Sequence, residues 1–171
     1  MFDIQLFGRL EVRTRGVRLS GADFGGDRPR HLLALLALRG EVSISELAEL
    51  LGTSKKSVEA DLSVLRTHLE PGINPRESVI VAHRGRLRLD PERVRVDVAR
   101  FDELIALAAG RAPERAVKPL TAAAFLANRP LLEDEDQPWA AELRNEYRAK
   151  LMIARRPAVE VAATAAEVTV I

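Results

Sequence analysis

Two short amphipathic segments joined by a glycine, within residues 43–69, constrain the fold of this chain more than any other feature. Ser43 and Glu46 have the S-x-x-E spacing of a capping box, and Gly52 follows the apolar run, so a short helix is predicted over 44–51. In the second segment, apolar residues recur at intervals of four, three and four, which places them on one helical face. They are Val58, Leu62, Leu65 and Leu69. Two helices joined by such a tight turn have the layout of a helix-turn-helix.

A predicted β-hairpin, residues 79–89, follows this pair of helices, with its turn near Arg84-Gly85. Three arginines occupy alternate positions in it, Arg84, Arg86 and Arg88. In an extended strand they share one face, while Leu87 and Leu89 point to the other. A helix-turn-helix followed by a hairpin is a winged helix, whose wing touches the DNA backbone or minor groove. The alternative is the solvated face of a half-buried strand.

The flanking segments complete a fold of the α+β class. Residues 2–20 alternate apolar and polar side chains between glycines, which predicts a small antiparallel sheet of three or four strands. A leucine-rich helix within residues 29–39 is apolar nearly all round and is the expected core helix. We therefore expect a winged-helix domain with a small N-terminal antiparallel sheet over residues 1–96, with 90–97 as a connector.

From Val98 onward the sequence is rich in alanine and is predicted to form an all-α domain over residues 97–156. Its helices are expected near 98–109, 113–128 and 139–156, with a kink or break at Pro119 and an acidic loop before Trp139. Trp139 and Tyr147 share one face of the last helix and are expected in the core, the alternative being a face exposed to a partner. Residues 157–171 show no single period and are predicted to be a disordered tail.

The composition argues against an enzyme. The chain has no cysteine, which removes thiol nucleophiles, thiolate metal sites and disulfides, and its three histidines lie in three different segments. No phosphate-binding loop is present, so neither a cofactor nor a metal is expected. The acidic run at residues 133–136 is expected to be solvated or to contact a partner. The chain shows no signal peptide and no apolar run of membrane-spanning length, which predicts a cytoplasmic protein without membrane contact.

The charge balance neither requires nor excludes nucleic acid. Residues 1–97 hold 16 basic and 14 acidic side chains, and residues 98–171 hold 10 and 11. Candidate contacts to duplex DNA are therefore local. On the second helix of the helix-turn-helix, entering the major groove, they are Lys55, Lys56, Ser63, Arg66 and Thr67. On the wing they are Arg84, Arg86 and Arg88.

The order of these segments resembles the SARP class of bacterial transcriptional activators. The resemblance rests on "LFGRLEVRTRGVRLS", "RPRHLLALLALRGEVSISELAELL", "LSVLRTHL", "VAHRGRLRLD", "VDVARFDELIALA" and "PLLEDEDQPWAAELRNEYRAKL", and covers residues 4 to about 152. It implies an OmpR-type winged helix followed by a TPR-like activator domain, here shortened. It also implies direct-repeat promoter sites, self-association as a homodimer and contact with RNA polymerase. The chain departs from the class at three positions, since members usually carry a Trp at the position of Leu51-Gly52 and arginines at the positions of Val64 and Thr67. The segment "LLGTSKKSVEADL" is instead similar to the helix-turn-helix of DeoR-like repressors.

Two functions follow as hypotheses. The first is a sequence-specific DNA-binding transcriptional regulator that acts as an activator. The second is a truncated protein-interaction module that pairs with a longer regulator without productive DNA binding. The near-neutral charge and the missing helix arginines favour the second, while the arginine hairpin in the position of a wing favours the first.

Overall fold

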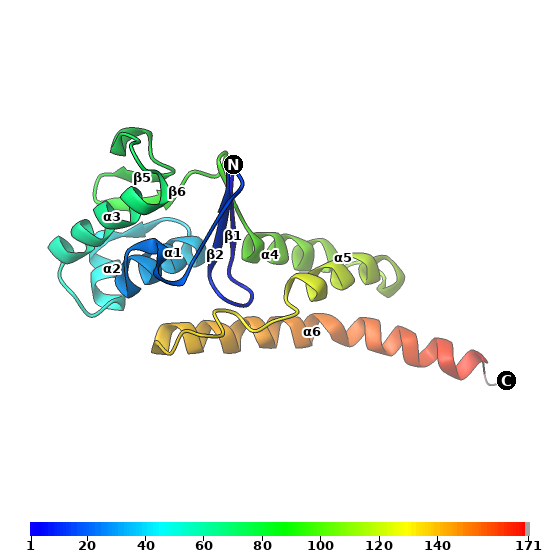
Figure 1. Ribbon diagram of the computed structural model, residues 1–171. Coiled ribbons are helices and arrows are strands. Elements are labelled where there is room, and N and C mark those ends of the chain that lie inside the picture. Colours follow the sequence, from blue (N-terminus) through cyan, green and yellow to red (C-terminus); the bar gives the residue numbers. More distant parts are fainter. Residues whose placement is uncertain (170–171) are drawn as a thin grey trace.

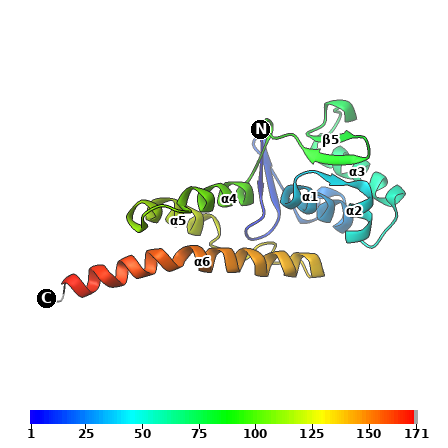
Figure 2. The ribbon, with the colours of Figure 1, turned by 180° about the vertical axis from the view of Figure 1, so that it is seen from behind.

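The computed structural model describes residues 1–169 of the chain, with side chains described for residues 1–156. A four-stranded sheet stands between the helix-turn-helix and the helices α4 (Asp97–Ala108) and α5 (Pro113–Leu126), and the long helix α6 (Pro138–Thr169) runs beneath all of them (Figure 1). The view from behind shows the sheet again between the helix-turn-helix and α4/α5, with α6 along one side of all three (Figure 2). The sheet is therefore the structural junction of the molecule.

The sheet contains the three predicted N-terminal strands and one strand that the sequence did not reveal. The strands are β1 (Phe2–Gln5), β2 (Glu11–Thr14), β3 (Val17–Ser20) and β7 (Val94–Val96), in the order β3-β2-β1-β7. The first three pair antiparallel, and β7 pairs parallel with β1. The prediction that residues 90–97 are only a connector was wrong, because this segment supplies the fourth strand. Phe2, Ile4 and Val12 are buried on one face of the sheet.

The helix-turn-helix forms as predicted and packs against the core helix α1 (Asp27–Arg39). It consists of α2 (Ile44–Leu50) and α3 (Lys55–Leu69). Ser43 caps α2 with both bonds of the capping box, and Ser54 caps α3 by accepting a hydrogen bond from the Ser57 amide. A single-turn 3-10 helix, η1 (Gly21–Phe24), precedes α1.

The wing is a three-stranded sheet. Its strands are β4 (Val42–Ser43), β5 (Ile80–His83) and β6 (Arg86–Leu89), in the order β4-β6-β5, and a short 3-10 helix η2 (Pro75–Glu77) leads into it. The hairpin turn is at Arg84-Gly85, as predicted, and both residues have left-handed φ angles of 49° and 72°. This is the two-residue turn whose twist matches that of the flanking strands. Strand β4 was not predicted, and it attaches the wing to the start of α2.

The C-terminal part consists of α4 (Asp97–Ala108), α5 (Pro113–Leu126) and α6 (Pro138–Thr169). Pro119 lies inside α5, so the break that was one of the two alternatives there does not occur. Helix α6 continues through Thr169, into the segment expected to be a tail from residue 157. Residues 170–171 of that predicted tail lie outside the described residues.

One hydrophobic core joins the winged helix to the C-terminal helices. The ring centroid of Phe7, which follows β1, lies 5.3 Å from the ring centroid of Phe101 on α4 and 6.0 Å from that of Tyr147 on α6. Trp139 and Tyr147 are buried in the same cluster, as expected for that face of the helix. The boundary predicted at residues 96/97 thus marks a change of secondary structure, while the side chains on its two sides share a core.

Candidate nucleic-acid interface

The exposed face of α3 is opposite the face that anchors it. Val58, Leu62, Leu65 and Leu69 are buried, as their spacing predicted. Lys55, Lys56, Ser63 and Thr67 are exposed, with the Thr67 hydroxyl donating to the Ser63 carbonyl at 3.0 Å. These side chains are polar and short apart from the two lysines, which leaves the helix free to approach the edges of bases.

One flank of α3 is covered by the segment before α1. A Cβ built on Gly25 would lie 2.5 Å from Val64 Cγ1 and 2.8 Å from His68 Cε1. Arg28 of α1 adds an ion pair to Asp61 at 3.0 Å. Gly25 also has a φ of +92°, so both the close approach of Val64 and the left-handed backbone conformation favour glycine at this position. The face of α3 available to a partner is therefore narrower than the sequence suggested, because Val64 lies toward η1.

Arg66 differs from the other candidates on the helix. Its side chain is half-buried, and Nη2 donates a hydrogen bond of 2.6 Å to the carbonyl oxygen of Ile80 on β5. Burial lowers the pKa of the Arg66 guanidinium, although the nearby Glu70 carboxylate opposes this. The structure thus directs Arg66 to the base of the wing. The sequence could not show this, because a helical position on the boundary between two faces is compatible with either.

The three wing arginines are all exposed. Arg86 and Arg88 project from the face of β6 opposite the buried Leu87, and Arg84 occupies the turn. Arg86 lies 3.5 Å from Glu41, a pair in which both side chains are about half exposed, so water screens it strongly. Within residues 1–156, neither Arg84 nor Arg88 makes an ion pair. The wing therefore presents positive charge that the side chains of residues 1–156 offset only through the screened Arg86–Glu41 pair.

A buried carboxylate that no sequence pattern singled out fixes α3 relative to the wing. Glu70 ends α3 and is buried. It accepts hydrogen bonds from the Ser78 hydroxyl at 2.6 Å and the Val79 amide at 3.0 Å, just before β5. Arg93, which leads into β7, reaches it at 3.3 Å. The helix and the wing are thereby held as one surface.

A second buried carboxylate joins the winged helix to the C-terminal helices. Glu135 accepts a hydrogen bond of 2.6 Å from Arg30 Nε and lies 2.7 Å from His31 Nε2, both on α1. Burial alone would raise its pKa, but the hydrogen bonds from His31 and Arg30 together lower the pKa of Glu135 to about 2. The acidic run 133–136 was expected to be solvated or to contact a partner. For Glu135 this was wrong, because its side chain is only 5% exposed.

Antiparallel backbone pairing holds the loop that carries Glu135 against residues 6–8, which follow β1. The amides of Leu132 and Glu133 donate to the carbonyls of Leu6 and Gly8, at 2.9 and 3.0 Å. Arg144 of α6 fills the inside of this loop, donating to the carbonyls of Leu131 and Glu135 at 2.8 Å each. The segment between α5 and α6 is thus fastened on both sides.

No protein-family description and no curated protein matches the chain. Among solved structures, the fold is similar to that of EmbR from Mycobacterium tuberculosis, determined in complex with a low affinity phosphopeptide, with a TM-score of 0.68 and 26% identity. The match covers 90% of this chain but 43% of the EmbR chain. This likeness supports a SARP-like fold. Within residues 1–169, no helix is both long and apolar enough to cross a bilayer, and no cluster of side chains suited to a metal ion occurs in the described part of the chain.

Proposed function

We propose that this chain is a transcriptional regulator that binds duplex DNA with α3 in the major groove and the wing on the adjacent backbone or minor groove. The observation that carries the proposal is the pairing of an exposed polar face on α3 with three exposed arginines on the wing. Glu70 and Arg66 hold these two elements together, so both would meet the duplex at once. The likeness to EmbR supports the same type of regulator at a coarse level.

Each residue has a distinct proposed role. Ser63 and Thr67 lie on the free face of α3 and would contact base edges, while Lys55 and Lys56 at its N-terminal end would contact phosphates. The wing arginines would follow the neighbouring phosphates. Arg66 would position β5 relative to α3, because its guanidinium already bonds the Ile80 carbonyl.

The finer features implied by the SARP resemblance are also part of the proposal. The winged helix would be OmpR-type, the helices after residue 97 TPR-like, and the chain a cytoplasmic activator that contacts RNA polymerase. Binding to direct repeats would involve a homodimer. The alternative, an interaction module without productive DNA binding, is not favoured, because the positive wing has no partner among the described side chains other than the screened pair to Glu41.

Selection of oligonucleotides from a random duplex pool, using the full chain, tests the proposal. A recovered motif should be a direct repeat whose spacing matches whole turns of DNA, about 10–10.5 base pairs. Fluorescence anisotropy on that site should then give an affinity that falls linearly with salt on a log-log scale. No enrichment, together with duplex binding weaker than about 1 mM at low salt, would contradict the proposal.

A further inference from the structure

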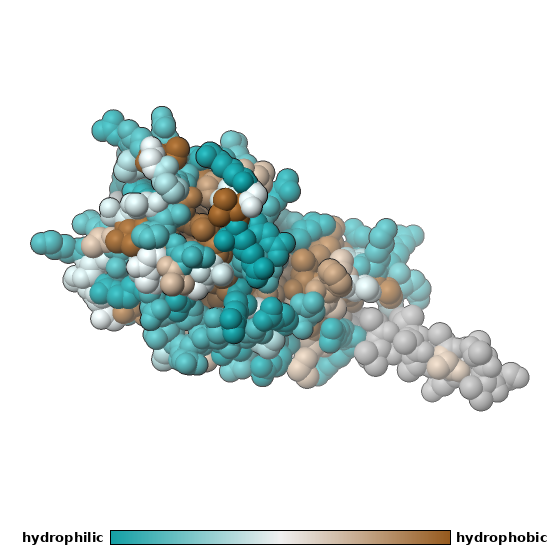
Figure 3. Space-filling view, viewed as in Figure 1, coloured by the Kyte–Doolittle hydropathy of each residue, from teal (hydrophilic) through white to brown (hydrophobic). Residues whose placement is uncertain are grey.

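A shallow groove of about 650 Å³ lies between α4 and α5. Its apolar lining consists of Leu104 on α4 with Ala122, Phe125 and Leu126 on α5. Hydrophobic side chains gather on the surface over these two helices (Figure 3). Neither α3 nor the wing contributes a residue, so the groove is separate from the candidate DNA interface.

Phe125 is the most exposed part of this lining. Its side chain is 77% exposed, whereas the other four phenylalanines of the chain are buried, at 6% exposure or less. It lies in the last turn of α5, on a different face from Leu120 and Ala123, which are buried. An apolar surface that is exposed in a groove and rimmed by polar side chains is typical of an interaction site. A partner that covered Phe125 would remove this surface from water.

The charged side chains that line the groove are both basic. They are Arg100 on α4 and Lys118 on α5, and no carboxylate lines the groove among the described side chains. Within residues 1–156, Lys118 makes no ion pair. Arg100 pairs with Glu103 at 3.0 Å, but these two side chains are 58% and 64% exposed, so water screens the pair.

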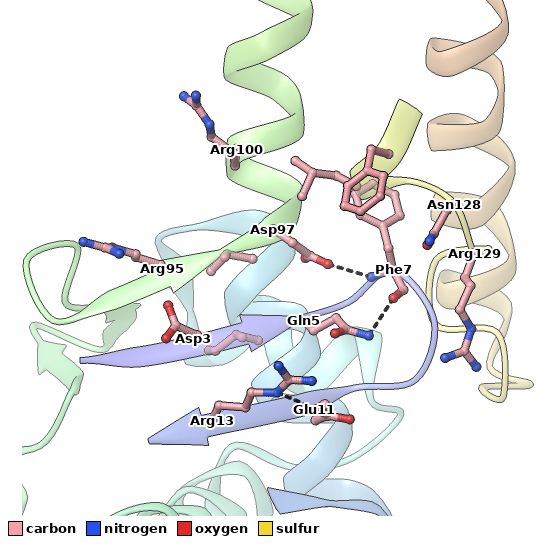
Figure 4. A pocket seen from close by; sticks show the side chains of 14 residues that line it. Asp3, Gln5, Phe7, Glu11, Arg13, Arg95, Asp97, Arg100, Asn128 and Arg129 are labelled. Carbon is pink, nitrogen blue, oxygen red and sulfur yellow. Dashed lines mark hydrogen bonds and ion pairs between the residues drawn. The ribbon is translucent and has the colours of Figure 1, made fainter. Parts of the chain in front are cut away.

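Asp97, one turn before Arg100, does not neutralise it either. Figure 4 shows Arg100 projecting from the start of α4 away from Asp97. The Asp97 carboxylate is turned the other way and accepts hydrogen bonds from the amides of Leu6 and Phe7, at 2.9 and 3.0 Å. Both cations of the groove are therefore available to a carboxylate from outside.

This combination favours a peptide over other partners. A DNA backbone would meet the two cations but would leave the apolar floor uncovered. A membrane presents a flat surface, whereas Leu104, itself only 6% exposed, lies in a recess between two helices. An amphipathic helix laid along such a groove places its apolar face on the floor and its charged residues at the rim.

We propose that the groove between α4 and α5 docks an acidic amphipathic helix of a partner protein. A large apolar side chain of that helix would lie against Phe125 and Leu104, while its Asp or Glu residues would pair with Arg100 and Lys118. The apolar floor would provide most of the affinity, and the basic rim would select the partner. The interaction does not require DNA binding, so it can fail or succeed independently of the proposed function.

Selection from a displayed library of random peptides, with the full chain as bait, tests this. Peptides of about 16 residues form roughly four helical turns, enough to span the groove. The enriched sequences should combine several Asp or Glu residues with large apolar residues spaced three or four apart. The leading peptide, labelled with a fluorophore, should bind in anisotropy with a Kd of about 100 µM or below.

Variants locate the site. Lys118→Glu and Phe125→Ala should each weaken binding of the leading peptide about tenfold or more. Both side chains are exposed, so circular dichroism should show that both variants stay folded. Arg155→Glu and Met152→Ala are the matched controls, because they make the same kinds of change at exposed positions of α6 outside the groove. Neither should change the Kd.

A charge exchange tests the role of the rim directly. A copy of the leading peptide in which Lys replaces every Asp and Glu should lose binding to the parent chain. It should regain part of that binding with the double variant Arg100→Glu, Lys118→Glu, because the signs of both partners are then reversed.

Four results would overturn the proposal. One is the absence of enriched peptides, and another is enrichment of peptides without an excess of acidic residues. The third is peptide binding that Lys118→Glu and Phe125→Ala leave unchanged. The fourth is saturable binding to vesicles of phosphatidylserine and phosphatidylcholine that Phe125→Ala abolishes, which would assign the groove to a membrane surface instead.

Discussion

Glu135→Gln is expected to destabilise the protein by about 3 kcal/mol at neutral pH. The native structure lowers the pKa of this carboxyl from 4.5 to about 2, through Arg30 and His31. The folded state therefore stabilises the ionised Glu135 carboxylate over its protonated form by about 3 kcal/mol more than the unfolded state does, since one pKa unit is about 1.4 kcal/mol. The substitution preserves the shape of the side chain and removes the charge, leaving Arg30 and His31 without their carboxylate.

The sign of the pH dependence follows from the direction of the shift. Because the pKa of Glu135 is lower in the folded state, its contribution is complete above the unfolded value of 4.5 and is lost as the pH falls toward about 2. Urea unfolding at pH 7 and at low pH measures this. The variant should therefore differ most from the parent at neutral pH, and the difference should shrink as the medium becomes more acidic.

Glu133→Gln, in the same acidic run, is the matched control. Glu133 pairs with Arg129, and their side chains are 26% and 51% exposed. An exposed pair of this kind contributes about 0–1 kcal/mol. If the two variants lose equal stability at pH 7, or if the loss from Glu135→Gln does not depend on pH, then the buried cluster does not fasten the helices to α1.

Three further predictions concern the DNA interface and the junction. Arg86→Ala should weaken binding to all duplexes alike and reduce the log-log salt slope by about 0.9, as anisotropy would show, whereas an unchanged slope would make the wing a solvated strand. Gly25→Ala should lower the free energy of unfolding in urea by more than about 2 kcal/mol, because Gly25 combines a left-handed φ with a 2.5 Å approach of its Cβ position to Val64. Gly52→Ala, with open space around a left-handed φ, should lower it by about 1 kcal/mol. Equal losses would contradict the role given to packing at Gly25. Asp97→Ala should cost about 1–3 kcal/mol and speed hydrogen exchange at the Leu6 amide, which loses its acceptor, and unchanged exchange there would contradict this.

The elements that could be predicted from the sequence are those with a strong period. The spacing of Val58, Leu62 and Leu65 gave α3 with its buried face, and the capping box at Ser43 gave the start of α2. The wing followed from alternation and the Arg84-Gly85 turn. In each case the information lies within a few neighbouring residues, and the tertiary contacts of the folded chain agree with it.

The missed elements depend on distant partners. Strand β7 is three residues long and forms only because β1 offers an edge, and the two-residue β4 forms only against β6. Arg66 and Glu135 are charged residues in exposed-looking contexts, and only the structure shows what each one meets. No local pattern separates a solvated carboxylate from one that lies opposite a histidine 104 residues earlier.

The parallel pairing of β1 with β7 bears on the order in which the chain folds during synthesis. Asp97, at the end of β7, receives its hydrogen bond from Leu6, 91 residues earlier. At about 5–20 residues per second, a ribosome needs roughly 5 to 20 seconds to make that interval. Throughout this time β1 can pair with β2 while its other edge stays open, and an open edge is a site for aggregation or for a chaperone. Strand β1 is therefore sealed at this edge only after β7, which is made much later, has left the ribosome.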